Sequence, residues 1–233
     1  MMKKTLIATT VLAATSTAAM AEISGNVALS SDYVWRGISQ TDNQMAISGG
    51  FDYAHDSGLY IGTWASNVNS DFFDNDTDPQ IELDIYGGYA GEFGAIGYDL
   101  GFTEYIYPGS SDINTLELYA GGSYGFTDTV SAAAKYYYSD DFFDTGDSAW
   151  RIEAGVDVGL PQDFSLSALV GKNDGEFFDG GFDYVDYSIG VSKPFVGLDF
   201  GLTYTDTDLD ASDCLPYDEI CDGRVVFSVS KSL

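Results

Sequence analysis

The sequence predicts an all-β fold, namely a transmembrane, antiparallel, up-and-down β-barrel of about 12 strands that follows a cleaved signal peptide. Three observations predict it. Apolar and polar residues alternate with a period of two along most of the chain, the connections are alternately short and long, and no stretch approaches 18 apolar residues. Besides a helix, only a closed barrel pairs every backbone group inside a bilayer.

The first segment is typical of an export signal. Two lysines precede a short apolar stretch at 6–14, and small residues follow as far as Ala21. The apolar stretch is too short to span a bilayer, which disfavours an anchor helix. We therefore expect 1–21 to be a signal peptide, and 22–233 to be an outer-membrane β-barrel domain.

The strand count comes from segments in which apolar residues alternate with polar ones. Trp150 and Ile152, for example, alternate with Arg151 and Glu153. Most segments have about 9–13 residues, the length that a tilted strand needs to cross a bilayer. The expected strands are 23–38, 44–54, 59–68, 80–90, 95–107, 113–124, 129–139, 149–160, 164–172, 182–192, 197–205 and 223–233.

The connections between these segments alternate in length. Short turns are expected at 56–58, 92–94, 127–128, 161–163 and 194–196. Long loops are expected at 69–79, 140–148, 173–181 and 206–222, with shorter ones at 39–43 and 108–112. Outer-membrane barrels have short periplasmic turns and longer external loops. A soluble β-sandwich, the alternative, has no reason to keep its long loops at one end.

Acidic residues dominate the charge of the chain. The 233 residues include 37 Asp and Glu against nine Lys and Arg, a formal net charge of -28. This excess argues against nucleic acid as a partner, because phosphate binding needs a basic surface. The four long loops hold 18 acids and no base. If these loops surround the mouth of the barrel, they would attract cations or bind divalent ions. The alternative is that they form only a solvated acidic exterior.

If the apolar stripe of each strand faces lipid, the other stripe lines the lumen. The pore-lining residues expected from this assignment are Asp32, Arg36, Asp52, Glu82, Asp84, Asp99, Glu117, Lys135, Arg151, Glu153, Asp157, Asp186, Asp199 and Arg224. A charge on the lipid face would cost about 2–4 kcal/mol near the midplane, so inward charges are expected in any barrel. The lumen is therefore either a polar pore or an interior filled by salt-bridged side chains.

Three long loops repeat an acid-Phe-Phe-Asp pattern. The aromatic residues of these external aromatic-acidic loops are Phe72, Phe73, Phe142, Phe143, Phe177 and Phe178. One interpretation is an aromatic girdle at the outer membrane interface, where rings prefer to lie. The other is a set of folded-in lips that narrow the pore or hold a ligand.

Few residues suggest bond-making chemistry. The single histidine, His55, lies in a tight turn, and no Gly-x-Ser-x-Gly elbow occurs, so neither an enzyme nor a cofactor is expected. Cys214 and Cys221 can form a disulfide in an oxidising compartment and staple one loop. Two Asp triplets, which begin at Asp74 and Asp206, lack the Gly and Glu of a calcium-binding EF-hand loop. Metal binding therefore stays open.

Several blocks resemble a known family. The segments SDYVWRGISQT at 31–41, GTWASNV at 62–68, ELDIYGGY at 82–89 and YPG at 107–109 are similar to motifs of the TorF-like porin family of proteobacterial outer-membrane β-barrel proteins. The resemblance covers most of the mature chain. It implies an outer-membrane porin, with no defined substrate and no catalytic residues. The chain ends in Leu233, whereas many outer-membrane barrels end in an aromatic residue.

Together these observations favour an outer-membrane porin through which small hydrophilic solutes diffuse, with a preference for cations. Lipid and lipopolysaccharide of the outer membrane would be its surroundings. The alternative is a closed-lumen structural or binding protein whose acidic external loops bind divalent ions.

Overall fold

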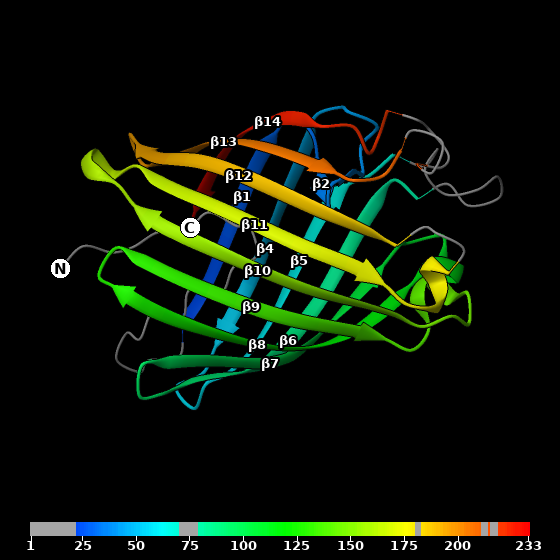
Figure 1. Cartoon of the computed structure of the whole chain (residues 1–233), viewed down its shortest axis with the longest axis horizontal. Coiled ribbons are helices and arrows are strands. Elements are labelled where there is room, and N and C mark those ends of the chain that lie inside the picture. The colour runs from blue at the N-terminus through cyan, green and yellow to red at the C-terminus, as the bar shows by residue number, and fades with distance from the viewer. Residues whose placement is uncertain (1–21, 70–78, 180–182, 211–213, 215–218) are drawn as a thin grey trace.

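The computed structural model describes residues 22–69, 79–179, 183–210, 214 and 219–233. The expected signal peptide lies outside these residues. Within them, twelve strands form one closed antiparallel barrel, as the sequence predicts (Figure 1). Around the barrel they are β1 (Glu22–Ser30), β4 (Ala46–Ala54), β5 (Leu59–Asn67), β6 (Ile81–Phe93), β7 (Ile96–Ile106), β8 (Thr115–Thr127), β9 (Val130–Ser139), β10 (Ala149–Gly159), β11 (Ser165–Asp174), β12 (Tyr184–Phe195), β13 (Leu198–Thr207) and β14 (Arg224–Ser232). No helix among the described residues is long and apolar enough to cross a membrane.

Alternation along each strand places apolar side chains outside and polar ones inside. On β10, Ile152 is exposed on the outer surface, whereas Arg151 and Glu153 are buried in the interior. The same pattern exposes Leu100 and buries Asp99 on β7. A soluble sandwich would bury its apolar side chains and expose its charges. The reverse arrangement is that of a barrel whose outer surface faces lipid.

The two ends of the barrel differ. At one end, the short-turn end, tight connections join β4 to β5, β6 to β7, β8 to β9, β10 to β11 and β12 to β13. The other, the long-loop end, carries longer connections, with the short 3-10 helices η2 (Ser111–Ile113), η3 (Phe142–Asp144) and η5 (Glu176–Phe178); η4 (Pro161–Asp163) lies in a short turn. Glu22 of β1 pairs with Ala54, the last residue of β4, so β1 starts at the short-turn end.

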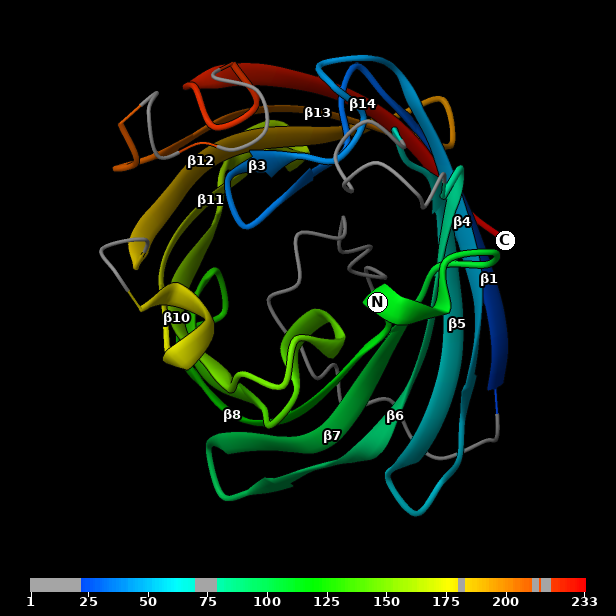
Figure 2. The same ribbon diagram turned by 90° about the vertical axis from the view of Figure 1, so that its right-hand side faces the viewer.

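The expected first strand, 23–38, is wrong in its second half. The wall strand β1 ends at Ser30, and the chain then turns into the barrel. There β2 (Val34–Trp35) and β3 (Ile38–Ser39) form a separate two-stranded sheet, inside the ring of wall strands (Figure 2). Residues 31–45 are called the inner hairpin from here on. The expected short loop at 39–43 lies in the second half of the inner hairpin.

A two-residue turn reverses the inner hairpin. Trp35 pairs with Ile38, and Arg36 and Gly37 between them have φ of 50° and 83°. Two positive φ values are the mark of a type I′ turn, which suits the twist of a β-hairpin. Asp32 and Arg36 therefore do not belong to a wall stripe, and both enter the lumen from the inner hairpin.

Candidate functional site

The polar interior of the barrel holds the charged residues that the sequence assigned to the lumen. Glu82, Asp84, Glu117, Arg151, Glu153 and Asp186 lie in its long-loop half, and Asp52, Asp99, Lys135, Asp157 and Asp199 lie between mid-barrel and the short-turn end. Asp32 and Arg36 lie on the inner hairpin, and Arg224 lies at the mouth. Asp32 and Arg36 do not lie on a wall strand, whereas the other residues of this set do.

Each of the four interior bases pairs with a carboxylate. The pairs are Arg36 with Glu117 at 2.6 Å, Lys135 with Asp99 at 3.2 Å, Arg151 with Glu153 at 3.0 Å and with Asp186, and Arg224 with Asp32 at 3.1 Å. All of these carboxylates are buried. A buried charge needs such a partner, because removal from water is costly for an isolated ion.

Arg151 is the most heavily bonded of the four bases. Its guanidinium donates to Glu153 at 3.0 Å, to both carboxylate oxygens of Asp186, and to the side-chain oxygen of Asn173 at 3.0 Å. It lies over Gly171 of the neighbouring strand, where a Cβ would come within 2.1 Å of Nη2. The sequence leaves this space open by placing glycine there, so the guanidinium lies flat against the wall.

Tyrosines form a second set of interior partners, which the sequence reasoning missed. Tyr33 and Tyr107 donate to the two oxygens of Glu82, each at 2.6 Å. Tyr60 donates to Asp99 at 2.6 Å, and Tyr137 donates to Glu153 at 2.9 Å. A usable signal existed, since Tyr60, Tyr107 and Tyr137 have the same strand parity as the inward-facing residues of their strands.

Within the inner hairpin, Asp32 ties the two arms together. Its Oδ1 accepts hydrogen bonds from Ser39 at 2.6 Å and Thr41 at 2.8 Å, and its Oδ2 accepts one from Arg224 at 3.1 Å. The backbone N–H of Gln40 also donates to the carbonyl of Tyr33. Hydrogen bonds between polar residues of the segment at 31–41 therefore stabilise the hairpin.

The tip of the inner hairpin reaches the far wall. Arg36 Nη2 donates to both oxygens of Glu117 on β8, at 2.8 and 2.6 Å. Its guanidinium stacks over Trp35 at 4.1 Å and lies 5.3 Å from the Tyr137 ring centre on β9. Burial lowers the pKa of Arg36, but the neighbouring Glu117 carboxylate raises it. The net result is a pKa above the ordinary value of arginine. Arg36 therefore stays charged.

Two of the three repeated Phe-Phe pairs meet over the mouth. Phe142 of η3 lies 4.9 Å from Phe177 of η5, measured between ring centres, and Phe178 packs on Tyr184. Phe142 is buried and stacks against Trp35 of the inner hairpin at 6.3 Å. These rings pack on one another instead of spreading along the outer surface. The third pair, Phe72 and Phe73, lies outside the described residues.

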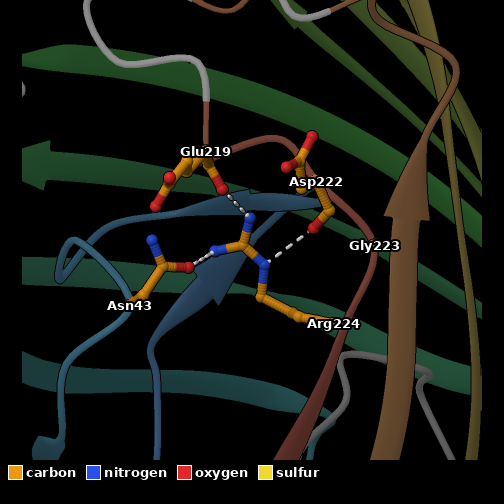
Figure 3. Close-up of a pocket in the computed structure, with 5 residues that line it drawn as sticks. All are labelled: Asn43, Glu219, Asp222, Gly223 and Arg224. Carbon is orange, nitrogen blue, oxygen red and sulfur yellow. Dashed lines mark hydrogen bonds between the residues drawn. The ribbon is translucent and has the colours of Figure 1, made fainter.

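The last long loop also holds the inner hairpin. Arg224 donates to the backbone carbonyls of Glu219 at 2.7 Å and Asp222 at 2.9 Å, and to the Asn43 side chain, around a small open pocket (Figure 3). Because Asn43 belongs to the inner hairpin, Arg224 joins the two segments at the mouth.

Cys214 and Cys221 are joined by a disulfide in that loop. With Ile220 they form a small buried apolar cluster, against which Ile38 of the inner hairpin packs. The Ser39 N–H donates to the Ile220 carbonyl at 2.9 Å. The disulfide-linked loop therefore packs against the second arm of the inner hairpin and holds it in place.

The interior holds more acids than its bases can pair. The inward carboxylates without an ion-pair partner in the described part of the chain are Asp52, Glu82, Asp84, Asp157 and Asp199. Asp52 and Glu82 accept hydrogen bonds from tyrosines, whereas Oδ1 of buried Asp84 has no hydrogen-bond partner among the residues that the structure describes. The described residues include no group of three or more potential metal ligands in a metal-binding arrangement.

Three solved structures with a similar fold are porins or outer-membrane channels. The KdgM porin in complex with disordered oligogalacturonate has a TM-score of 0.60 and 11% identity, covering 91% of this chain and 98% of that one. The NanC porin has a TM-score of 0.59 and 10% identity, with 90% and 98% covered. An outer membrane channel from Pseudomonas putida F1 has a TM-score of 0.52 and 9% identity, with 93% and 96% covered. The fold is thus the porin-like β-barrel.

The family is shown by sequence. A family model described as "Bacterial protein of unknown function (Gcw_chp)" matches residues 13–233, and the chain belongs to this family. No curated protein matches the chain.

Proposed function

We propose that this protein is an outer-membrane channel through which small hydrophilic solutes diffuse, with a preference for cations. One observation carries the proposal. A closed barrel of the porin type encloses a polar interior in which ten carboxylates accompany four bases, and every base is already paired. The remaining carboxylates leave a negative potential inside the barrel, which favours cations and repels anions.

The charge of the interior also bears on the class of solute. Oligogalacturonate, the ligand in the KdgM complex, is a chain of sugars that each carry a carboxylate. An interior with excess carboxylates disfavours such a polyanion. Neutral sugars, amines and inorganic cations fit the charge better.

The location follows from the same features. We infer that residues 1–21 direct export, that 22–233 insert into the outer membrane, and that lipid and lipopolysaccharide surround the barrel. We also infer that the channel belongs with the TorF-like porins, on the motifs at 31–41, 62–68, 82–89 and 107–109. The porin fold and the absence of a nucleophile-base motif in the sequence support a channel that is not an enzyme.

Swelling of liposomes that contain the purified barrel tests the proposal. Free lysine should enter faster than free glutamate, which has a similar size and the opposite net charge, and a small neutral sugar should enter at an intermediate rate. Liposomes without protein are the control. Equal rates for lysine and glutamate would contradict the cation preference, and no swelling with any solute would contradict the channel.

A closed-lumen binding or structural protein is the second candidate. The observation that favours it is the inner hairpin, which crosses the mouth and contacts the opposite wall. Under this alternative, the acidic external loops would bind divalent ions. Liposomes that do not swell, together with calcium-induced protection of those loops from proteolysis, would favour it over the channel.

A further inference from the structure

The inner hairpin contacts most of the wall around the long-loop half of the lumen. Tyr33 packs on Trp64 of β5 and bonds to Glu82 of β6. Trp35 packs on Tyr105 of β7, and Arg36 bonds to Glu117 of β8. A Cβ on Gly37 would come within 2.4 Å of Thr207 on β13 and within 3.0 Å of Asp186 on β12, and Asp32 bonds to Arg224 of β14. The inner hairpin lies inside the ring of strands at the long-loop end, where a solute would enter (Figure 2).

The barrel wall does not depend on the inner hairpin. Strands β1 and β4, which flank it, pair directly with each other along their whole lengths, from Glu22 with Ala54 to Ser30 with Ala46. The ring of twelve strands is therefore closed without residues 31–45. The inner hairpin can change position while the wall stays intact.

The tip of the inner hairpin and its second arm are held differently. On the second arm, backbone hydrogen bonds join Ser39 to Ile220 and Gln40 to Asn69. At the tip, Trp35 and Arg36 contact the far wall through their side chains, and the side chains of the Arg36–Glu117 ion pair are 8% and 2% exposed. The tip is thus attached by a charge pair and ring contacts, and the second arm by the main chain.

We propose that the inner hairpin sets the permeability of the channel and that the Arg36–Glu117 ion pair is the latch that holds it across the lumen. The inference rests on the proposed function, because it concerns passage through the same interior. When the latch opens, Glu117 joins the unpaired carboxylates Glu82 and Asp84 in facing the lumen. The opened path is therefore more acidic than the closed one and passes small cations.

Two charge-neutralising variants separate a latch from a simple charge effect. Arg36→Gln makes the interior more negative and Glu117→Gln makes it less negative, yet both remove the ion pair. If the pair is a latch, single-channel conductance in potassium chloride rises in both variants. If only local charge matters, the cation current rises in Arg36→Gln and falls in Glu117→Gln, which would overturn the proposal.

Lys135→Gln is the matched control. It removes the base of another interior pair, with Asp99, which joins β7 to β9 without touching the inner hairpin. It should shift the ion preference in the same direction as Arg36→Gln does. It should not raise the single-channel conductance to that of the latch variants. An equal rise in conductance in Lys135→Gln would overturn the latch.

A third variant keeps the test decisive if the buried pair is needed for folding. Replacing residues 33–40 by a short Gly-Ser linker removes β2, the tip and β3 and leaves the pairing of β1 with β4 intact. Its conductance should be higher than that of the wild type and should match the fully open level of the latch variants. A conducting wild type with an unchanged deletion variant would overturn the inference alone. No current in any variant would instead overturn the proposed function.

Discussion

Arg151 shows, at the scale of one residue, how this barrel keeps charge inside its wall. Its guanidinium is 3% exposed and bonds to Glu153, Asp186 and Asn173. Lys172, near the long-loop end of β11, also makes two ion pairs, with Asp174 and Asp183, but its side chain is 42% exposed. Water can replace the partners of the lysine and cannot replace those of the arginine, so the two bases differ in their contribution to stability.

We expect Arg151→Ala to lower the free energy of unfolding by about 3–5 kcal/mol, because it leaves two buried carboxylates unpaired. Lys172→Ala should cost less than about 1 kcal/mol, since exposed ion pairs contribute little. Urea unfolding of the two variants in lipid vesicles measures the difference. Equal losses of stability would show that Arg151 lies in a wetter environment than the structure gives it.

At the scale of an element, the inner hairpin depends on a glycine at its tip. Gly37 has a φ of 83°, and a Cβ there would come within 2.4 Å of Thr207 Cγ2. Gly109, in another long loop, has a φ of 93° but no atom within 4 Å of a built Cβ. The two glycines share a backbone conformation and differ in their surroundings.

Gly37→Ala should therefore undock the tip, whereas Gly109→Ala should carry only the backbone penalty of roughly 1–2 kcal/mol. Amide hydrogen exchange at the inner hairpin is the measurement. Exchange at Ser39 and Gln40 should accelerate in Gly37→Ala and stay as in the wild type in Gly109→Ala. Unchanged protection in Gly37→Ala would mean that the tip does not touch β13.

The disulfide supports the inner hairpin from outside it, because it cross-links the loop against which Ile38 packs. Closing so small a ring contributes roughly 2–3 kcal/mol in the chain-entropy model. We expect a variant with Cys214→Ser and Cys221→Ser to keep the barrel folded and to expose the inner hairpin to a protease. Wild-type resistance to proteolysis in this variant would contradict the packing described for Ile38.

The wall could be predicted from the sequence and the inner hairpin could not, for a physical reason. Wall strands repeat one local rule, with apolar residues facing lipid and polar residues facing inward, so alternation is enough. Tyr33 and Trp35 continue that alternation beyond Ser30. Arg-Gly is also a weaker turn signal than Asn-Gly or Asp-Gly.

For the same reason, the sequence predicts which residues face the interior but not which of them contact one another. Strand parity identified the carboxylates, but it could not show that Arg36 meets Glu117, which lies 81 residues away. Tyr60 and Tyr107 have the inward parity, but parity alone does not show that they bond to Asp99 and Glu82. Parity gives the face of a strand on which a residue lies, whereas its partner depends on strand register and on where the loops fold.

At the scale of the whole molecule, the acidic excess is distributed in two places. The four long loops predicted from the sequence carry 18 acids and no base. The interior adds the carboxylates that have no ion-pair partner in the described part of the chain, including Asp84, whose buried Oδ1 accepts no hydrogen bond from those residues. Both sets of residues have the same sign of charge, so under the proposed function a cation would meet an attractive potential.

The reversal potential of the wild-type barrel in a planar bilayer, under a gradient of potassium chloride, tests the central claim most directly. A channel lined by excess carboxylates should give a reversal potential close to the potassium equilibrium potential. The preference should weaken at high salt, which screens the charges. A reversal potential on the chloride side of zero, or a barrel that inserts and carries no current, would contradict the account.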